Sequence, residues 1–359
     1  MKVLLIRAMG LGDVASILVP AVRIWREARP DARIDVLTWG AGRDLMELVP
    51  GVDRVHAIAP EDWPDDLYAA VPRFAALAER IAREGYDEVV NLDTWFMVCV
   101  LARILEQVGI PVRGNTISMR VAELLARARD GSLTQAYFDE PAQYLRSTFP
   151  GMRDWTSAWW QRFPDAGAYP DFYLSHCCGL PGTTSARLPI GADRSLREAA
   201  QGRPVVALSA RGSRRAKQYR QPAQLQDELQ RRGFHVWTGF DGSVPMQRTL
   251  ARLAGSDLLV TVPTSTQWLA KLVGCPSLML PGPLPARVLG AEYAVDRYMP
   301  CQPCATRDCR AQVDYACMDM PARVVADAVE ACLAGAATAD PDARATVRTP
   351  RTTRITVQA

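Results

Sequence analysis

Strand-like and helix-like segments alternate in two separate stretches of this chain, and this alternation limits its fold more than any other feature. Apolar runs of strand length lie in the first stretch at 2–8, 32–39, 53–58 and 86–93. Further runs lie in the second stretch at 204–210, 234–240, 257–262 and 276–282. Strands that alternate with helices favour parallel, doubly wound sheets. We therefore predict an α/β fold with two Rossmann-like domains that face each other across a cleft.

The predicted helices have apolar residues at helical spacing and occupy 43–50, 68–84, 96–109, 122–129, 223–233, 246–255, 265–274 and 321–335. One more helix follows the first strand, and its regular part either starts near Pro20 or kinks there. We predict an N-terminal domain at 1–200 and a C-terminal domain at 201–335. The polar tail at 336–359 lacks apolar periodicity, so we expect it to be flexible.

Composition excludes several classes of protein. The chain has 359 residues, of which 48% are hydrophobic and 23% charged, a normal balance for soluble domains. A net charge of +3 is too small to indicate a nucleic-acid partner. The sequence contains no apolar run of membrane-spanning length and starts directly with a strand rather than a charged leader. We therefore expect a cytoplasmic protein.

The loop after the first strand reads Gly10-Leu11-Gly12-Asp13. It lacks the third glycine of a dinucleotide-binding fingerprint. The two glycines form either a simple tight turn or a place where the backbone passes close to a substrate. Asp13 is either a helix N-cap or a general base, and one carboxylate can serve as both.

The second stretch contains three further candidate sites. The basic segment 210–220 contains Arg211, Ser213 and Lys217, and it is either a solvated loop or a place that holds negative charge. Hydroxyl residues open a helix at 264–266, where they cap the helix, bind an anion or do both. Asp241 follows a strand, where a loop aspartate is usually solvated.

Four cysteines follow the last predicted strand, at Cys301, Cys304, Cys309 and Cys317. Four thiolates joined by short loops can close a tetrahedral site for zinc or iron. The alternative is a group of reduced thiols beside a hydrophobic junction. A metal here would be structural, because nothing in the segment supplies a catalytic water.

Several segments resemble family 9 glycosyltransferases, the bacterial heptosyltransferases. The opening VLLIRAMGLGDVASILVPAVRIWREARPDARIDVLTW is similar to the start of these enzymes. The family has similar features at the positions of GVDRVHAI, YDEVVNLD, Lys217 and DLLVTVPTSTQWLAKLVGCPSLMLPGP. Many members also contain a cysteine segment that is close to CQPCATRDCRAQVDYACMDMPARVV. The resemblance covers most of 1–110 and 203–335, and it implies the B-type glycosyltransferase fold of two Rossmann-like domains.

The resemblance also implies roles for particular residues. Asp13 would be the general base that takes a proton from the acceptor hydroxyl, with Gly10 and Gly12 beside the acceptor. Lys217 would contact the donor phosphates or sugar. The other donor-binding residues would be Arg211, Gly212, Ser213, Asp241, Thr264, Ser265 and Thr266. Some protein-modifying members use a similar cysteine cluster to bind a metal.

The sequence departs from the family pattern at the start of the helix at 265–274. Pro263 stands where the family has an acid that contacts the donor sugar, Ser265 replaces a glycine, and Trp268 replaces a histidine. These departures leave open a different donor or a loss of activity.

The resulting prediction is an inverting glycosyltransferase that uses a nucleotide-sugar, by resemblance ADP-heptose, without a catalytic metal or other cofactor. The acceptor would be a lipopolysaccharide-core intermediate at the inner face of the inner membrane, where the enzyme would bind peripherally. The alternatives are an autotransporter-type protein or another glycan as acceptor, a different nucleotide-sugar donor, and a non-catalytic binding or scaffold subunit.

Overall fold

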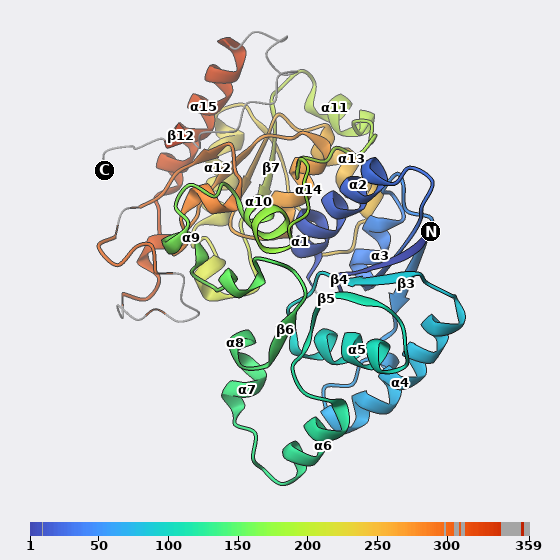
Figure 1. The fold of residues 1–359 in the computed structure, drawn as a ribbon. Helices are drawn as coiled ribbons and strands as arrows, with labels where there is room; N and C mark the ends of the chain where they lie inside the picture. Colours follow the sequence, from blue (N-terminus) through green and yellow to red (C-terminus); the bar gives the residue numbers. More distant parts are fainter. Residues whose placement is uncertain (9, 298, 305–308, 310–312, 339–352, 355–359) are drawn as a thin grey trace. The chain divides into compact units, whose positions relative to one another are not determined.

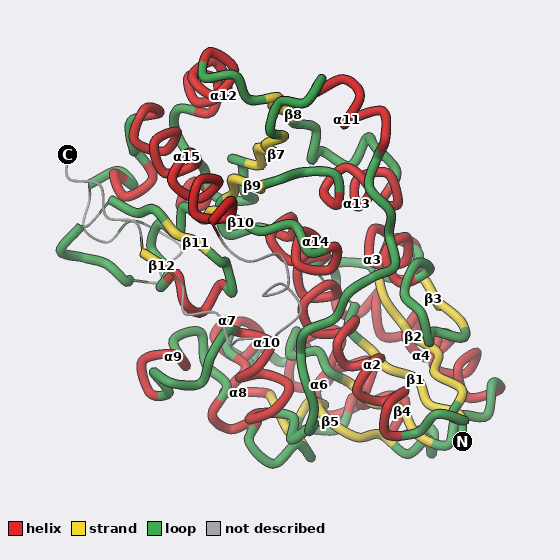
Figure 2. The backbone as a smooth tube through the Cα atoms, turned by 90° about the horizontal axis from the view of Figure 1, so that it is seen from above, coloured by secondary structure: helices red, strands yellow, loops and turns green. Residues whose placement is uncertain are grey.

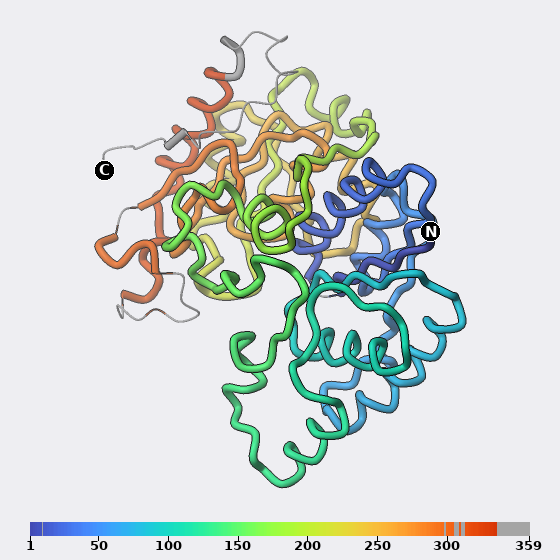
Figure 3. The backbone as a smooth tube through the Cα atoms, viewed as in Figure 1, coloured from blue at the N-terminus to red at the C-terminus, as the bar shows by residue number. Residues whose placement is uncertain are grey.

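The computed structural model describes residues 1–8, 10–297, 299–304, 309, 313–338 and 353–354 (Figure 1). The chain divides into two compact units, and its path can be followed by colour in Figure 3. Unit 1 comprises residues 1–156 and 170–186, and unit 2 comprises residues 157–169 and 187–359. Residues 157–169, which the sequence analysis places in the first domain, therefore belong to unit 2, as do residues 187–200. Their backbone bonds to that unit, because the Leu188 N–H donates to the Leu272 carbonyl at 2.7 Å.

The sheet of unit 1 has the strand order β3-β2-β1-β4-β5-β6. Its strands are β1 (Lys2–Ile6), β2 (Arg33–Trp39), β3 (Arg54–Ile58), β4 (Glu88–Asn91), β5 (Val112–Ile117) and β6 (Leu145–Ser147). All pairings are parallel except that of β5 with β6. The order reverses direction between β1 and β4, as in dinucleotide-binding Rossmann sheets. The first four strands confirm the prediction, whereas β5 and β6 were not predicted.

A long, interrupted helix follows β1. It consists of α1 (Leu11–Asp13), a π-helical turn at Val14–Leu18 and α2 (Val19–Ala28). Pro20 lies in the first turn of α2, directly after the π-helical turn. Proline lacks an N–H and displaces the preceding turn, so a wider turn just before it is the expected accommodation. The helix therefore starts well before Pro20 and is irregular there.

Unit 1 contains several further helices. They are α3 (Gly40–Met46), α4 (Leu67–Arg83), α5 (Phe96–Gln107), α6 (Val121–Arg129), α7 (Gln135–Asp139) and α8 (Pro141–Tyr144), followed by α10 (Tyr169–Asp171), whose first residue belongs to unit 2, and a π-helical segment at Phe172–Cys177. Figure 1 shows α4 and α5 on the same side of the sheet, where one apolar core joins them to β1 and β2. Leu4, Ile6, Phe74 and Leu101 lie in this core and are fully buried.

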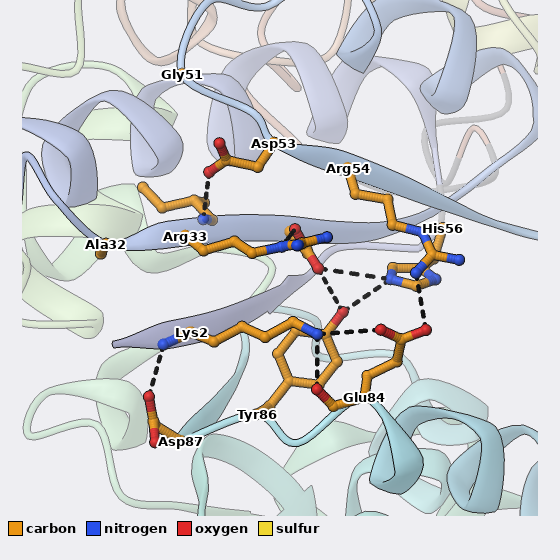
Figure 4. A network of polar contacts seen from close by, with 12 residues as sticks. Lys2, Ala32, Arg33, Gly51, Asp53, Arg54, His56, Glu84, Tyr86 and Asp87 are labelled. Atoms are coloured by element: carbon orange, nitrogen blue, oxygen red, sulfur yellow. Dashed lines mark hydrogen bonds and ion pairs between the residues drawn. The ribbon is translucent and has the colours of Figure 1, made fainter.

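A polar network closes the amino-terminal edge of the unit 1 sheet (Figure 4). The fully buried Asp35 accepts a hydrogen bond from the Tyr86 hydroxyl at 2.8 Å, and His56 Nε2 lies 2.8 Å from the same hydroxyl. Lys2 Nζ donates to Glu84 Oε2 at 3.0 Å. Burial raises the pKa of Tyr86 and lowers the pKa of His56, so both groups favour their neutral forms. The network lies at the amino-terminal ends of the strands, whereas Asp13 follows the carboxyl end of β1.

The sheet of unit 2 is parallel throughout, with the order β12-β11-β10-β9-β7-β8. Its strands are β7 (Val205–Ser209), β8 (His235–Trp237), β9 (Leu258–Thr261), β10 (Ser277–Met279), β11 (Tyr293–Ala294) and β12 (Thr353–Arg354). Its helices are α9 (Trp159–Arg162), α11 (Arg194–Ala200), α12 (Pro222–Arg231), α13 (Met246–Ala254), α14 (Ser265–Val273) and α15 (Ala322–Thr338). Helices α12 and α15 lie side by side (Figure 2), and Arg232 after α12 bonds to Asp327 on α15 at 2.7 Å.

The predicted tail at 336–359 is described only in part. Helix α15 continues to Thr338, and Thr353–Arg354 form β12, which pairs in parallel with β11. The other tail residues, 339–352 and 355–359, lie outside the described residues. In the part of the chain that the structure describes, no helix combines the length and the apolar character needed to cross a bilayer.

Candidate functional site

Each sheet has one point where the strand order reverses, and the candidate residues follow the strands that flank it. In open α/β sheets, ligands bind outside the carboxyl ends of the strands at such a point. In unit 1 the flanking strands are β1, which leads to Asp13, and β4, which leads to Asp93. In unit 2 they are β7, which leads to the segment 210–220, and β9, which leads to Thr264. The topology therefore places Asp13, the segment 210–220 and Thr264 at the positions where such sheets bind ligands.

Asp13 ends the short helix α1 and interacts with a buried arginine. Its Oδ1 lies 3.2 Å from Nη2 of Arg7, the residue that follows β1. The side chain makes no capping hydrogen bond to the π-helical turn that follows, while its backbone N–H donates to the Gly10 carbonyl at 2.9 Å. The Asp13 side chain is 31% exposed, whereas that of Arg7 is 3% exposed. The loop thus presents a carboxylate to solvent with a guanidinium beneath it.

Arg7 is held by the end of the neighbouring strand. Its Nη1 donates to the Leu92 carbonyl at 2.6 Å and lies 4.0 Å from Oδ1 of the fully buried Asp93. The hydroxyl of Tyr173 also donates to the Leu92 carbonyl, at 2.7 Å. Arg7, Asp93 and Tyr173 were not singled out in the sequence analysis. The positions of Arg7 after the first strand and of Asp93 after the fourth are the signal that could have identified two of them.

A pocket of about 100 Å³ lies beside the same loop. It is lined by Ala8, Gly10, Leu11, Val14, Trp39, Ala41 and Gly42. Gly10 has φ +82°, and a Cβ atom at this position would lie 3.2 Å from Oδ2 of Asp13. Gly10 therefore lines the pocket and also lies beside the carboxylate, so a side chain at this position would crowd Asp13. Gly12 lies within α1 and does not line the pocket.

The segment after β7 folds back on itself and positions Lys217. Arg211 pairs with Gln218 as an antiparallel bridge, and the Gly212 N–H donates to the Lys217 carbonyl at 2.8 Å. A Cβ atom on Gly212 would lie only 2.6 Å from Cβ of Lys217, so this close approach requires glycine. Arg211 and Ser213 are exposed and Lys217 is half-buried. The loop brings these three predicted donor residues together at one switch point.

The same loop is bonded to the end of the cysteine segment. Asp314 accepts hydrogen bonds from Arg215 at 2.9 Å and from Arg220 at 2.7 Å. The Tyr219 hydroxyl donates to the Met320 carbonyl at 2.9 Å, and the Arg220 backbone N–H donates to the Met318 carbonyl at 3.3 Å. Side-chain and backbone bonds therefore join residues 215–220 to residues 314–320.

The hydroxyl residues at the start of α14 differ in accessibility. Thr264 and Ser265 are half-buried, whereas Thr266 is buried and its Oγ1 accepts a hydrogen bond from Ser209 Oγ at 3.0 Å. The hydrogen bond between Ser209 and Thr266 joins the end of β7 to the first turn of α14. Asp241 follows β8, outside this pair of strands, and is exposed. Hydrogen bonds from the Ser243 hydroxyl and N–H lower the pKa of Asp241, so its carboxylate is engaged in a local turn.

The four clustered cysteines are half-buried. Burial raises the pKa of Cys317 to about 11, and the neighbouring thiols Cys304, Cys301 and Cys309 add to this effect. Within the described residues, however, no group of three or more His, Cys, Asp or Glu side chains is arranged to hold a metal ion. Residues 305–308 and 310–312 of this segment lie outside that description. The metal site therefore stays a prediction.

Comparison of the whole chain with known proteins gives a clear result for structure. No protein-family model matches the sequence, and no curated protein matches it either. A glycosyltransferase of family 9 from Veillonella parvula has a similar structure, with a TM-score of 0.62 and 18% identity over 93% of this chain and 97% of that chain. The chain has the fold of the family 9 glycosyltransferases.

Two further structures share this family 9 fold. The ADP-heptose lipopolysaccharide heptosyltransferase II of E. coli has a TM-score of 0.62 and 14% identity over 94% of this chain and 100% of its own. TibC of enterotoxigenic E. coli, described as an iron-containing dodecameric glycosyltransferase, has a TM-score of 0.54 and 13% identity over 94% of this chain and 77% of its own. These likenesses confirm the predicted α/β class with two Rossmann-like domains, and they confirm the resemblance to family 9.

Proposed function

We propose that this chain is an inverting glycosyltransferase that transfers a sugar, by similarity heptose, from a nucleotide-sugar to an acceptor hydroxyl. The observation that carries the proposal is the position of Asp13. Its carboxylate stands at the switch point of the unit 1 sheet, beside the pocket-lining Gly10 and next to a buried arginine. A general base requires an ionised group within hydrogen-bond reach of a bound substrate.

In the proposed reaction, Asp13 accepts the proton of the acceptor hydroxyl. The hydroxyl oxygen then forms a bond to the anomeric carbon of the donor sugar from the face opposite the leaving group. The bond between that carbon and the diphosphate oxygen breaks, and its electron pair leaves with the nucleoside diphosphate. Attack from the opposite face inverts the configuration at the anomeric carbon.

The donor would be held at the switch point of unit 2. Lys217 and Arg211 supply positive charge for a diphosphate, and Thr264 and Ser265 supply hydroxyls at a helix N-terminus. Protein cations at this position can stabilise the leaving group without a catalytic metal. The acceptor would be a lipopolysaccharide-core glycan at the inner face of the inner membrane, or a protein as for autotransporter-type enzymes, and the enzyme would act in the cytoplasm.

A second candidate function follows from the entrance to α14. The residue before Thr264 is the buried Pro263, so this turn offers no carboxylate to the donor sugar where the family has one. This observation favours either a different nucleotide-sugar or a subunit that binds a partner without catalysis.

Donor binding separates these candidates. We expect ADP-heptose to raise the melting temperature, because a ligand that binds only the native state stabilises it by about 2.7 kcal/mol at 100 times its Kd.

Lys217→Ala should weaken binding about 10- to 100-fold, the effect of losing a hydrogen bond to a charged group. Arg231→Ala, which removes an exposed cation from α12, is the matched control and should bind normally. Calorimetry with ADP-, UDP- and GDP-sugars measures the Kd of each sugar for the wild type, Lys217→Ala and Arg231→Ala. A preference for UDP- or GDP-sugars would change the donor, and a lack of binding in the whole panel would favour the scaffold.

The four clustered cysteines remain a predicted structural site for zinc or iron. The described residues do not form such a site by themselves, so no step of the reaction is assigned to a metal. TibC, which shares the fold, is described as iron-containing. We expect elemental analysis of the purified chain to find about one zinc or iron per chain, and Cys309→Ser to lose it. A folded, metal-free preparation would contradict the prediction.

A further inference from the structure

Arg7 is fixed by groups on several sides. Its backbone N–H donates to the Leu37 carbonyl at 3.2 Å, and its Nη1 donates to the Leu92 carbonyl at 2.6 Å. The guanidinium carbon lies 5.2 Å from the ring centre of Tyr173. With 3% of its side chain exposed, Arg7 lies in a region of low dielectric, where the nearby Asp93 carboxylate compensates its charge. The guanidinium therefore cannot turn away without losing interactions that nothing else replaces.

The two oxygens of the Asp13 carboxylate have different surroundings. Oδ1 lies 3.2 Å from Arg7 Nη2. Oδ2 lies close to Gly10, at 3.2 Å from the position that a Cβ atom would occupy there. Gly10 also lines the pocket, so Oδ2 is the oxygen beside a pocket-lining residue. An arginine that binds one oxygen of a carboxylate also fixes the direction of the other.

We propose that Arg7 is the positioning residue of the base: it holds Oδ1 of Asp13 and thereby directs Oδ2 to the acceptor hydroxyl as the atom that receives the proton. This inference rests on the proposed function, because it assigns the geometry of the proposed base. Arg7 itself contacts no substrate and exchanges no proton. Its guanidinium always remains charged, which makes it a permanent anchor for a carboxylate that must change its protonation state.

Asp93 and Tyr173 hold Arg7 in turn. Asp93 is fully buried, and its Oδ2 and Oδ1 accept hydrogen bonds from the N–H groups of Ala8 and Trp95, both at 3.0 Å. Tyr173 bonds to the same carbonyl as Arg7. It comes from the segment 170–186, with which the chain returns to unit 1. The base is therefore positioned from the ends of two strands and from a distant segment of the same unit.

The test is a double-mutant cycle between Arg7→Lys and Asp13→Asn, with ADP release from ADP-heptose in the presence of a deacylated lipopolysaccharide-core acceptor as the activity. Lysine keeps the charge but cannot bond to the Leu92 carbonyl and Asp13 in the fork geometry of a guanidinium. We expect Arg7→Lys to lower kcat about 100-fold, the effect of a misplaced catalytic group, while the calorimetric Kd of ADP-heptose stays within twofold. In the Asp13→Asn background, Arg7→Lys should cause no further loss of kcat.

Tyr173→Phe keeps the aromatic ring beside Arg7 and removes only the hydroxyl. It should lower kcat about 2- to 10-fold with unchanged donor affinity, the range for one hydrogen bond, and it tests the proposal even if Arg7→Lys does not fold. A normal kcat for either folded variant, or losses that multiply in the double mutant, would overturn the role of Arg7 and leave the proposed function in place. If the wild-type chain itself releases no ADP above background, the proposed function fails and this inference fails with it.

Discussion

Asp13→Asn should reduce sugar transfer about 10²- to 10⁴-fold, the usual contribution of a general base. Asparagine has the same shape as aspartate, and its carbonyl oxygen can still accept a hydrogen bond from Arg7 Nη2, so the loop should keep its structure. It cannot take up a proton from an acceptor hydroxyl. The donor would be bound by residues of the other unit, so its Kd should not change. Steady-state ADP release and calorimetry with ADP-heptose measure the two quantities on the same preparation.

The matched control for this variant is Asp44→Asn. Asp44 is a half-exposed acid of α3 that pairs with its neighbour Arg43. The same chemical change at this site should leave kcat within about twofold, since exposed ion pairs contribute little. Full transfer by Asp13→Asn would remove Asp13 from the mechanism, and an equal loss in both variants would mean that the assay reports folding rather than catalysis.

Gly114→Ala should lower the free energy of unfolding by about 3 kcal/mol or more, through backbone strain and overpacking together. Gly114 lies in β5 with φ +100°, a conformation that alanine rarely adopts. Its backbone pairs with Asn91 at the end of β4. A Cβ atom at this position would lie 2.3 Å from the Asn91 carbonyl oxygen and 2.7 Å from the Phe149 ring, so the strands would have to separate. Urea unfolding of the wild type and the variant measures the difference.

Gly109→Ala separates the two causes of this loss. Gly109 has a similar φ of +91°, but no atom lies within 4 Å of the position of its Cβ. Strain of the backbone alone should then cost about 1–2 kcal/mol. If both variants lose the same stability, the close approach of β4 and β5 at Gly114 does not limit the packing of this sheet.

The sequence predicts the parallel sheets well because their central strands are buried on both faces. Such strands appear as continuous apolar runs, and β1, β7 and β9 have this pattern. Strand β5 has the sequence VRGNTI, in which polar residues and a glycine interrupt the run. Its pairing depends on the close contact of Gly114 with Asn91, and a local pattern does not reveal a contact with another strand.

The candidate site, like the fold, is predictable from the sequence only in part. Asp13 and Lys217 follow strands whose ends can be read from the sequence, so their approximate places at the switch points follow from the topology. Tyr173 could not be predicted in this way, because it lies in an irregular segment whose return to unit 1 is decided by long-range packing. The pairing of Arg7 with Asp13 also required the structure, since it depends on the turn at Gly10.

The bonds between residues 215–220 and residues 314–320 have a thermodynamic consequence. Asp314 holds two arginines of the loop that contains Lys217, and Tyr219 bonds to the chain beyond it. Two segments that share contacts in this way form one cooperative unit, so a change that stabilises one segment also stabilises the other. Linkage makes this coupling reciprocal. The free energy that residues 314–320 contribute to ligand binding at this loop equals the free energy by which the bound ligand stabilises residues 314–320.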